Sequence, residues 1–253
     1  VGKLSRLGCG AREGFGPFTP GFRLVPYGDA AALEAAIGPN TVGFLVEPIQ
    51  GEGGIVVPPA GYLERAREIC TRHRVLFIAD EIQTGLGRTG RLFACDHESV
   101  KPDLLILGKA LGGGMMPVSA VLASREILGV FRPGDHGSTF GGNPLACAVA
   151  RVSMKILQRD RLAERAASLG AAFLERLRGL RSPRVREVRG RGLLIGIELR
   201  PDAGPAKDYA KRLKEEGILC KDTVESVLRI APPLVIEERD LGWATERIAK
   251  VLA

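Results

Sequence analysis

The sequence predicts an α/β protein with an open, mostly parallel sheet, followed by a smaller α+β unit. Short, continuous apolar runs at 42–46, 75–79 and 104–107 have the length of strands. A segment with helical periodicity separates the first two runs, and from Pro144 the order changes to two long helices. Continuous apolar strands are typical of sheets buried on both faces, so we expect helices on both sides of the first sheet.

The first unit is expected to span residues 1–160. It opens with a stretch rich in glycine and proline, residues 1–29, which predicts an irregular, ordered loop. Gly38 and Pro39 end the first helix, and the next helix has apolar residues at helical spacing. The expected elements are a helix at 30–37, a strand at 42–46, a helix at 61–73, and strands at 75–79, 104–107 and 118–122.

The second unit is expected to span residues 161–253. A long helix beginning at Pro144 leads into it, and its mixture of helices and short apolar runs predicts a separate, smaller α+β domain. The expected elements are a helix at 162–180, a strand at 193–199, a helix at 206–217, a strand at 227–230 and a helix at 237–252.

The charge of the chain does not indicate a nucleic-acid partner. Lys and Arg number 36 against 29 Asp and Glu, which gives a formal net charge of +7. The basic residues are interspersed with acidic ones, and the densest basic stretch, residues 181–191, contains no aromatic residue. We interpret that stretch as solvated surface and expect no nucleic-acid binding.

The cysteines favour a reducing compartment. The five of them are far apart and never in CxxC spacing, which argues against a disulfide framework or a zinc ribbon. The three histidines are also dispersed, so no metal site is expected. No apolar run approaches the roughly 20 residues of a membrane span. We therefore expect a cytoplasmic protein without a membrane partner, although a targeting segment preceding Val1 stays possible.

Three polar residues follow expected strands at the edge where an α/β sheet binds ligands. Glu47 ends the run at 42–46, Asp80 follows 75–79, and Lys109 lies just after 104–107. A lysine can form a Schiff base with the aldehyde of pyridoxal phosphate, and a carboxylate can keep its pyridine nitrogen protonated. Each residue alone has a plainer interpretation: Lys109 as a solvated surface group, and Asp80 as a helix cap or turn residue.

A glycine pattern at residues 85–90 matches the dinucleotide-binding form GxGxxG. In that motif the glycines lead directly from a strand into a helix. Here five residues separate the pattern from the strand at 75–79, so we do not interpret it as a nucleotide site.

Four motifs occur in a fixed order along the chain. They are VEPIQGEGG at 46–54, ADEIQTG at 79–85, GKALGGG at 108–114 and HGSTFGGNP at 136–144. This combination resembles the class III aminotransferases, which have the fold type I architecture of pyridoxal-phosphate enzymes. The resemblance runs from about Phe15 to Ala253 and implies that residues 1–160 are part of the cofactor-binding large domain.

The resemblance also implies roles for individual residues. Lys109 matches the lysine that binds the cofactor and moves the proton, and Asp80 matches the partner of the pyridinium nitrogen. Gln83 matches the residue that hydrogen-bonds the ring hydroxyl, and Ile82 the residue that flanks the ring. Two residues match phosphate ligands that reach the cofactor of the partner subunit, which implies a homodimer with shared active sites. These are Ser138 and Thr139.

Three segments resemble ornithine δ-aminotransferases more than other members of the class. They are GFGPFTPGF at 14–22, CTRHRVLFIAD at 70–80 and GMMPVSAV at 114–121. Arg229 matches the arginine that binds a substrate carboxylate, for which a guanidinium fork is well suited. Glu52 matches the glutamate that masks this arginine while ornithine presents its δ-amine. An ordinary surface salt bridge is the alternative interpretation.

Nothing in the chain corresponds to the N-terminal segment of the family, and the resemblance deteriorates before Phe15. We therefore expect a truncated, split or fragmentary enzyme that cannot transaminate alone, because one wall of the cofactor site is missing. Two alternatives to ornithine transamination with 2-oxoglutarate stay open. One is an acetylornithine or 4-aminobutyrate aminotransferase, and the other is a non-catalytic remnant or one half of a split enzyme.

Overall fold

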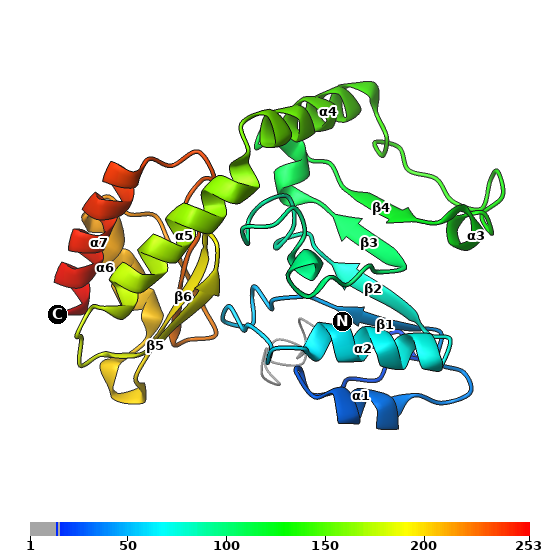
Figure 1. Cartoon of the computed structure of the whole chain (residues 1–253), viewed down its shortest axis with the longest axis horizontal. Helices are drawn as coiled ribbons and strands as arrows, with labels where there is room; N and C mark the ends of the chain where they lie inside the picture. Colours follow the sequence, from blue (N-terminus) through cyan, green and yellow to red (C-terminus); the bar gives the residue numbers. More distant parts are fainter. Residues whose placement is uncertain (1–13, 15) are drawn as a thin grey trace.

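The computed structural model describes residue 14 and residues 16–253, which form two sheets with their covering helices (Figure 1). The first sheet has the strand order β1-β2-β3-β4. Its strands are β1 (Gly43–Val46), β2 (Leu76–Asp80), β3 (Leu104–Leu107) and β4 (Ala120–Ala123). The first three strands run parallel and β4 runs antiparallel to β3, which confirms a mostly parallel sheet.

Helices cover both faces of this sheet. On one face, α1 (Ala30–Ala36) and α2 (Tyr62–Arg72) pack against β1 and β2 through a core that includes Leu33, Ile69 and Phe77. On the other face lies α4 (Pro144–Arg159), whose Leu157 packs with Leu107 and Leu111. The side chain of Asn143 accepts a hydrogen bond from the Ala146 amide, and Pro144 occupies the first turn, so the sequence fixes where α4 begins.

Short helical turns connect the strands of the first sheet. They are η3 (Ala94–Glu98), η4 (Lys109–Gly112) and α3 (Arg125–Leu128). Of these, η4 follows β3 directly and rests on α4, because the Ser153 hydroxyl donates to the Ala110 carbonyl oxygen at 3.0 Å. The turn that begins with Lys109 is thus supported from behind by a long helix.

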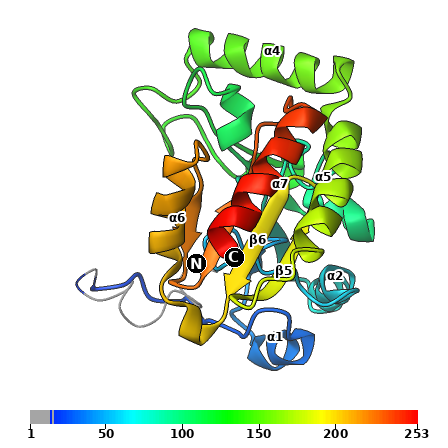
Figure 2. The same cartoon turned by 90° about the vertical axis from the view of Figure 1, so that its left-hand side faces the viewer.

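The second sheet, here called the C-terminal sheet, is antiparallel with the order β5-β6-β8-β7. Its strands are β5 (Val185–Arg191), β6 (Leu194–Leu199), β7 (Lys221–Thr223) and β8 (Val227–Ile230). Three helices pack on one face: α5 (Leu162–Arg178), α6 (Ala206–Glu215) and α7 (Glu238–Leu252) (Figure 2). A single turn, η5 (Pro201–Ala203), precedes α6.

The C-terminal sheet differs from the expectation in two strands. β7 is absent from the expected elements, and so is β5, which falls in the basic stretch 181–191. The interpretation of that stretch as solvated surface is wrong for Arg189, whose side chain is only 14% exposed. The two sheets are joined by α4 and α5, and none of the described helices is long and apolar enough to cross a membrane.

The face of the C-terminal sheet opposite its helices covers the loop 49–57. Because side chains alternate along a strand, Ile195, Ile197 and Leu199 point to the helices while Leu194 and Gly196 point to the loop. Leu194 packs there with Ile49 and Ile55. The loop that follows β1 therefore contacts both sheets.

Candidate active site

Two of the expected cofactor residues lie at neighbouring strand ends of the first sheet. Asp80 is the last residue of β2 and pairs in register with Ile106 of β3, three residues before Lys109. The Asp80 carboxylate accepts a hydrogen bond from the Ile82 amide at 3.1 Å. The sheet therefore brings a carboxylate and an amine to the same edge, as the sequence predicts.

The backbone around Lys109 has an unusual conformation. Lys109 has a φ of 41°, in the left-handed region that residues with a Cβ adopt rarely. At Gly108, just before it, a Cβ would lie 3.3 Å from Cγ2 of Ile82, so glycine lets η4 pass close to that side chain. Such strain is maintained only when the surroundings impose it, and it is concentrated at functional sites. The side chain of Lys109 is exposed, so a ligand at the strand ends can reach it.

Glu52 lies at the centre of a polar cluster beside these strand ends. Its Oε1 accepts from Nη1 of Arg229 at 2.5 Å, and its Oε2 accepts from Nζ of Lys221 at 3.1 Å. Burial raises the pKa of the Glu52 carboxyl, but hydrogen bonds from Arg229, Lys221 and Gln83 outweigh this and lower it to about 2. Glu52 is therefore ionised at neutral pH and forms an ion pair with Arg229, which keeps this arginine from binding another carboxylate.

Gln83 joins this cluster. Its Nε2 donates to Oε1 of Glu52 at 3.2 Å, and its Oε1 accepts from Arg229 at 3.4 Å. A Cβ at Gly51 would lie 1.7 Å from Oε1 of Gln83, so only glycine at position 51 leaves room for the amide. The structure thus places Gln83 between the strand end that carries Asp80 and the Glu52–Arg229 pair.

The two cations that bind Glu52 belong to a row of cross-strand neighbours on the C-terminal sheet, together with a third cation, Arg189. Arg189 of β5 pairs with Gly196 of β6, Gly196 pairs with Arg229 of β8, and Arg229 pairs with Lys221 of β7. Cross-strand partners share a face of the sheet, so the three cations point to the same side. Sequence reasoning missed Lys221 and Arg189, since only the register of distant strands places them beside Arg229.

The two expected phosphate ligands lie apart from this cluster. Ser138 and Thr139 are exposed on the long segment between α3 and α4, at the periphery of the molecule (Figure 1). The Ser138 hydroxyl accepts a hydrogen bond from the Gly141 amide at 2.8 Å, which is a local turn contact. Within the described residues, the structure brings Glu52, Gln83 and Arg229 together but does not add these two hydroxyls to them.

The glycine pattern at 85–90 packs where the two sheets meet. The loop does not lead into a helix. Nη1 of Arg88 donates to the carbonyl oxygens of Leu193 and Pro232, and a Cβ at Gly90 would lie 2.9 Å from Cα of Ala167 in α5. These glycines permit close backbone packing.

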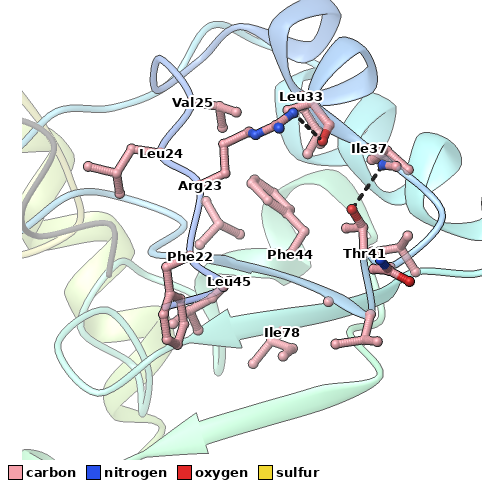
Figure 3. A pocket seen from close by; sticks show the side chains of 18 of the residues that line it. Phe22, Arg23, Leu24, Val25, Leu33, Ile37, Thr41, Phe44, Leu45 and Ile78 are labelled. Carbon is pink, nitrogen blue, oxygen red and sulfur yellow. Dashed lines mark hydrogen bonds between the residues drawn. The ribbon is translucent and has the colours of Figure 1, made fainter. Parts of the chain in front are cut away.

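A separate pocket of about 730 Å³ lies beside β1; Glu47 is part of its wall, but Asp80 and Lys109 are not. Its walls are mainly apolar, with Phe22, Leu33 and Phe44 among them (Figure 3). Arg23 spans one side, and its Nη1 donates to the Ala36 carbonyl oxygen at 3.1 Å. β1 pairs only with β2 among the described strands, so the pocket borders an open sheet edge.

Comparisons with known proteins agree with this arrangement. The class III aminotransferase family model matches residues 4–252. The family model thus reaches back to residue 4, eleven residues before the start expected near Phe15, and residues 1–13 lie outside the described part of the structure. An ornithine aminotransferase of Bacillus subtilis (strain 168) is 59% identical over 241 residues, which cover 95% of this chain and 59% of the relative.

Two solved structures are also similar. An ornithine aminotransferase of Toxoplasma gondii, with partial occupancy of pyridoxal phosphate at its active site, is 52% identical with a TM-score of 0.92, over 95% of this chain and 57% of the other. An acetylornithine aminotransferase of Elizabethkingia anophelis is 51% identical with a TM-score of 0.89, over 95% and 62%.

The chain spans about three fifths of the length of these relatives. Over that length it has the α/β fold of the pyridoxal-phosphate-dependent class III aminotransferases, with the mostly parallel sheet followed by the antiparallel one. The chain belongs to the class III aminotransferase family, whose cofactor is pyridoxal phosphate.

Proposed function

We propose that this chain carries part of an ornithine aminotransferase. The reaction moves the δ-amino group of L-ornithine to 2-oxoglutarate and gives glutamate 5-semialdehyde and glutamate. The observation that supports it most directly is the Glu52–Arg229 pair at 2.5 Å, beside the strand ends that carry Asp80 and Lys109. Ornithine has one carboxylate and 2-oxoglutarate has two, so the second carboxylate needs a binding site that is blocked while ornithine is bound. The Glu52–Arg229 pair can serve as such a site.

The residues at the strand ends fit pyridoxal phosphate by their chemistry. An amine follows β3 and a carboxylate ends the neighbouring β2, while Gly108 keeps the path beside Ile82 free of a Cβ. When bound, pyridoxal phosphate supplies an aldehyde that takes up the amino group and a ring that accepts electrons. Lys109 would hold that aldehyde and then take the proton from the substrate carbon at Nζ. Asp80 would keep the ring nitrogen protonated, and Ile82 would flank the ring.

The cluster around Glu52 would select the substrate of each half of the reaction. While Glu52 is paired with Arg229, this arginine is not free to bind a second carboxylate, which suits the δ-amine end of ornithine. When 2-oxoglutarate binds, Arg229 would exchange Glu52 for the substrate carboxylate. Lys221 already bonds the other oxygen of Glu52, so the displaced carboxylate keeps a cationic partner. Gln83, which bonds both members of the pair, would turn to the ring hydroxyl of the cofactor.

The position of Ser138 and Thr139 supports a homodimer with shared sites. Both are exposed on the segment between α3 and α4. The segment 115–152, which contains both residues, also exposes large apolar side chains, which are typical of an interface. They include Met115, Val121, Val130, Phe131, Phe140, Leu145 and Val152. In such a dimer the two hydroxyls would bind the phosphate of the partner's cofactor.

We further propose that residues 1–160 are a portion of the cofactor-binding large domain and 161–253 the small domain. The free cysteines of the described residues, such as Cys70 and Cys95, suit the cytoplasm.

An absorbance spectrum of the purified chain with pyridoxal phosphate tests the function. We expect weak binding through Lys109 and no turnover, because the chain spans about three fifths of its relatives. A band that depends on Lys109 and shifts when ornithine is added would show a working enzyme. Lys109→Ala is the control, and a band that persists in this variant would contradict the role of Lys109.

Two alternatives are distinguished by substrate and by complementation. Reaction with N-acetylornithine in preference to ornithine would favour an acetylornithine enzyme. The similarity to the acetylornithine aminotransferase of Elizabethkingia anophelis is the observation that supports this alternative. A 4-aminobutyrate enzyme would be recognised in the same way. Activity restored by the N-terminal part of a relative, added as a separate chain, would favour one half of a split enzyme over a non-catalytic remnant.

A further inference from the structure

The loop that carries Glu52 is closed on itself. Gln50 and Val56 exchange backbone hydrogen bonds at 3.1 and 3.0 Å, which fixes the base of the loop. The Gly51 amide donates to Oε2 of Glu47 at 3.1 Å. Glu52 therefore projects from the tip of a short, closed loop.

The far side of this loop is attached to the C-terminal sheet. Nε of Arg189 donates to the Ile55 carbonyl oxygen at 3.0 Å, and Nη2 donates to the Gly54 carbonyl oxygen at 2.7 Å. The remaining nitrogen, Nη1, donates to Glu198 and Glu187. A planar guanidinium spreads its donors over three nitrogens in a fixed fork, which matches two successive carbonyls and a carboxylate, whereas the three donors of an ammonium diverge from one atom.

The backbone held by Arg189 is strained. Ile55 is β-branched and has a φ of 51°, and its side chain is fully buried. A Cβ at Gly196 would lie 2.9 Å from Cβ of Ile55, so the row across the sheet leaves space for this residue. Such a conformation relaxes unless it is held. The loop holds it from within, through the hydrogen bond from the Ile55 amide to the Gly51 carbonyl oxygen at 3.4 Å, and the C-terminal sheet holds it from outside, through Arg189 and Leu194.

We propose that Arg189 is a positioning residue that keeps the Glu52 loop on the C-terminal sheet and so maintains the Glu52–Arg229 pair. Arg189, Gly196, Arg229 and Lys221 form one row, and the loop lies over that row. Gly54 and Ile55 contact its Arg189 end, while Glu52 contacts its Arg229 and Lys221 end. Arg189 on β5 thus helps to keep Glu52 on Arg229, which lies two strands away on β8.

The test is the affinity of the chain for glutarate, a dicarboxylate that needs no cofactor, measured by NMR titration. The inference rests on the proposed function only in that Arg229 accepts a carboxylate. Glu52 competes with glutarate for Arg229, so Arg189→Met should bind glutarate about fivefold more tightly than the unmodified chain. Simple structural damage would weaken binding or leave it unchanged, so the direction of the effect identifies positioning.

Two variants complete the design. Arg186→Met is the matched control, because Arg186 lies on the same strand and pairs with Glu198 at 3.1 Å without contacting the loop. It should leave the affinity for glutarate unchanged. Arg189→Lys keeps the charge but loses the fixed fork that binds both carbonyl oxygens, so it should tighten glutarate binding by a smaller factor than Arg189→Met. It replaces the methionine variant as the test if that variant unfolds.

Glu52→Gln separates the two hypotheses. It removes the competing carboxylate directly and should bind glutarate more tightly. If it does not, the proposed carboxylate site fails. If it does, while folded Arg189→Met and Arg189→Lys bind glutarate like the unmodified chain, the positioning role of Arg189 is overturned.

Discussion

Lys221 and Arg229 are cross-strand partners on β7 and β8, and each holds one oxygen of Glu52. Two cations directly opposite each other on a sheet destabilise it unless an anion lies between them. Glu52 is that anion, and it comes from a loop of the other sheet. The carboxylate therefore serves two purposes: it neutralises a like-charged pair and it closes the arginine to substrate.

Acid should weaken the ion pairs of Glu52 with Arg229 and Lys221, and the pKa of Glu52 gives the pH range in which this happens. The pKa of Glu52 is lowered from 4.5 to about 2, mainly because hydrogen bonds from Arg229 and Lys221 outweigh the effect of burial. A group whose pKa is lower in the folded state stabilises the fold above its unfolded pKa and loses this contribution as the pH falls through the folded pKa. The difference in unfolding free energy between the unmodified chain and Glu52→Gln should thus be constant near neutral pH. It should shrink from about pH 4.5 to about pH 2, as urea unfolding would show. A difference that is independent of pH would contradict the ion pair.

Replacing Lys221 should change the pKa of Glu52 clearly but the free energy of unfolding only slightly. In Lys221→Met the carboxylate loses one hydrogen bond and the repulsion across β7 and β8 disappears, so the pKa of Glu52 should rise toward 4.5. Because Lys221 is 60% exposed, the unfolding free energy should change by no more than about 1 kcal/mol. Carbon-detected NMR of labelled glutamate measures the pKa. Lys211→Met is the control, since Lys211 has a similar exposed pair with Asp208.

A side chain at Gly54 should disturb the contact between the Glu52 loop and the β7–β8 turn. Gly54 has a φ of 100°, and a Cβ there would lie 2.9 Å from Cγ2 of Val224. Gly54→Ala should therefore destabilise the chain by about 3 kcal/mol. Gly61→Ala isolates the backbone contribution, because Gly61 has a φ of 77° with nothing within 4 Å, and should cost about 1 kcal/mol. If urea unfolding shows the same loss of unfolding free energy in both variants, the β7–β8 turn moves aside for the methyl group at position 54 and the predicted clash is wrong.

Arg88 should contribute to stability and not to nucleotide binding. Its guanidinium satisfies the carbonyl oxygens of Leu193 and Pro232, so Arg88→Met leaves two acceptors without this donor and should cost about 2 kcal/mol. Arg91→Met, at an exposed position of the same segment, should cost less than about 0.5 kcal/mol. Chemical unfolding measures both. Binding of a dinucleotide that is lost in Arg88→Met would contradict this and indicate that residues 85–90 form a nucleotide site.

The parts of the fold that follow from local pattern were predictable. The strand Leu104–Leu107 coincides with its apolar run, and Asp80 and Lys109 lie at strand ends as expected. β5 was missed because it has three arginines and a glutamate beside only two valines, a composition that is also typical of a solvated surface. β7 has only three residues, too few for a periodicity.

The rest of the candidate site depends on register, which no local pattern contains. Glu52 and Arg229 were named from motifs, whereas Lys221 became part of the site only because β7 pairs with β8 at that residue. Arg189 reaches the loop across 135 positions of sequence. Contacts at such separation follow from how whole elements dock, so their partners are visible only in three dimensions.

The open edge of β1 has a practical consequence for work on this chain. Among the described strands, β1 and β4 each have one neighbour, so the described residues leave backbone donors and acceptors unpaired by a strand at each end of the first sheet. Strand edges of this kind recruit other strands, and the apolar pocket beside β1 adds to the attraction. Concentrated samples should therefore tend to aggregate edge to edge. A dimer detected by size-exclusion chromatography alone could then arise from these strand edges. A dimer that disappears when Phe131 and Phe140 are replaced by serine would instead use the exposed apolar residues proposed to form the shared sites.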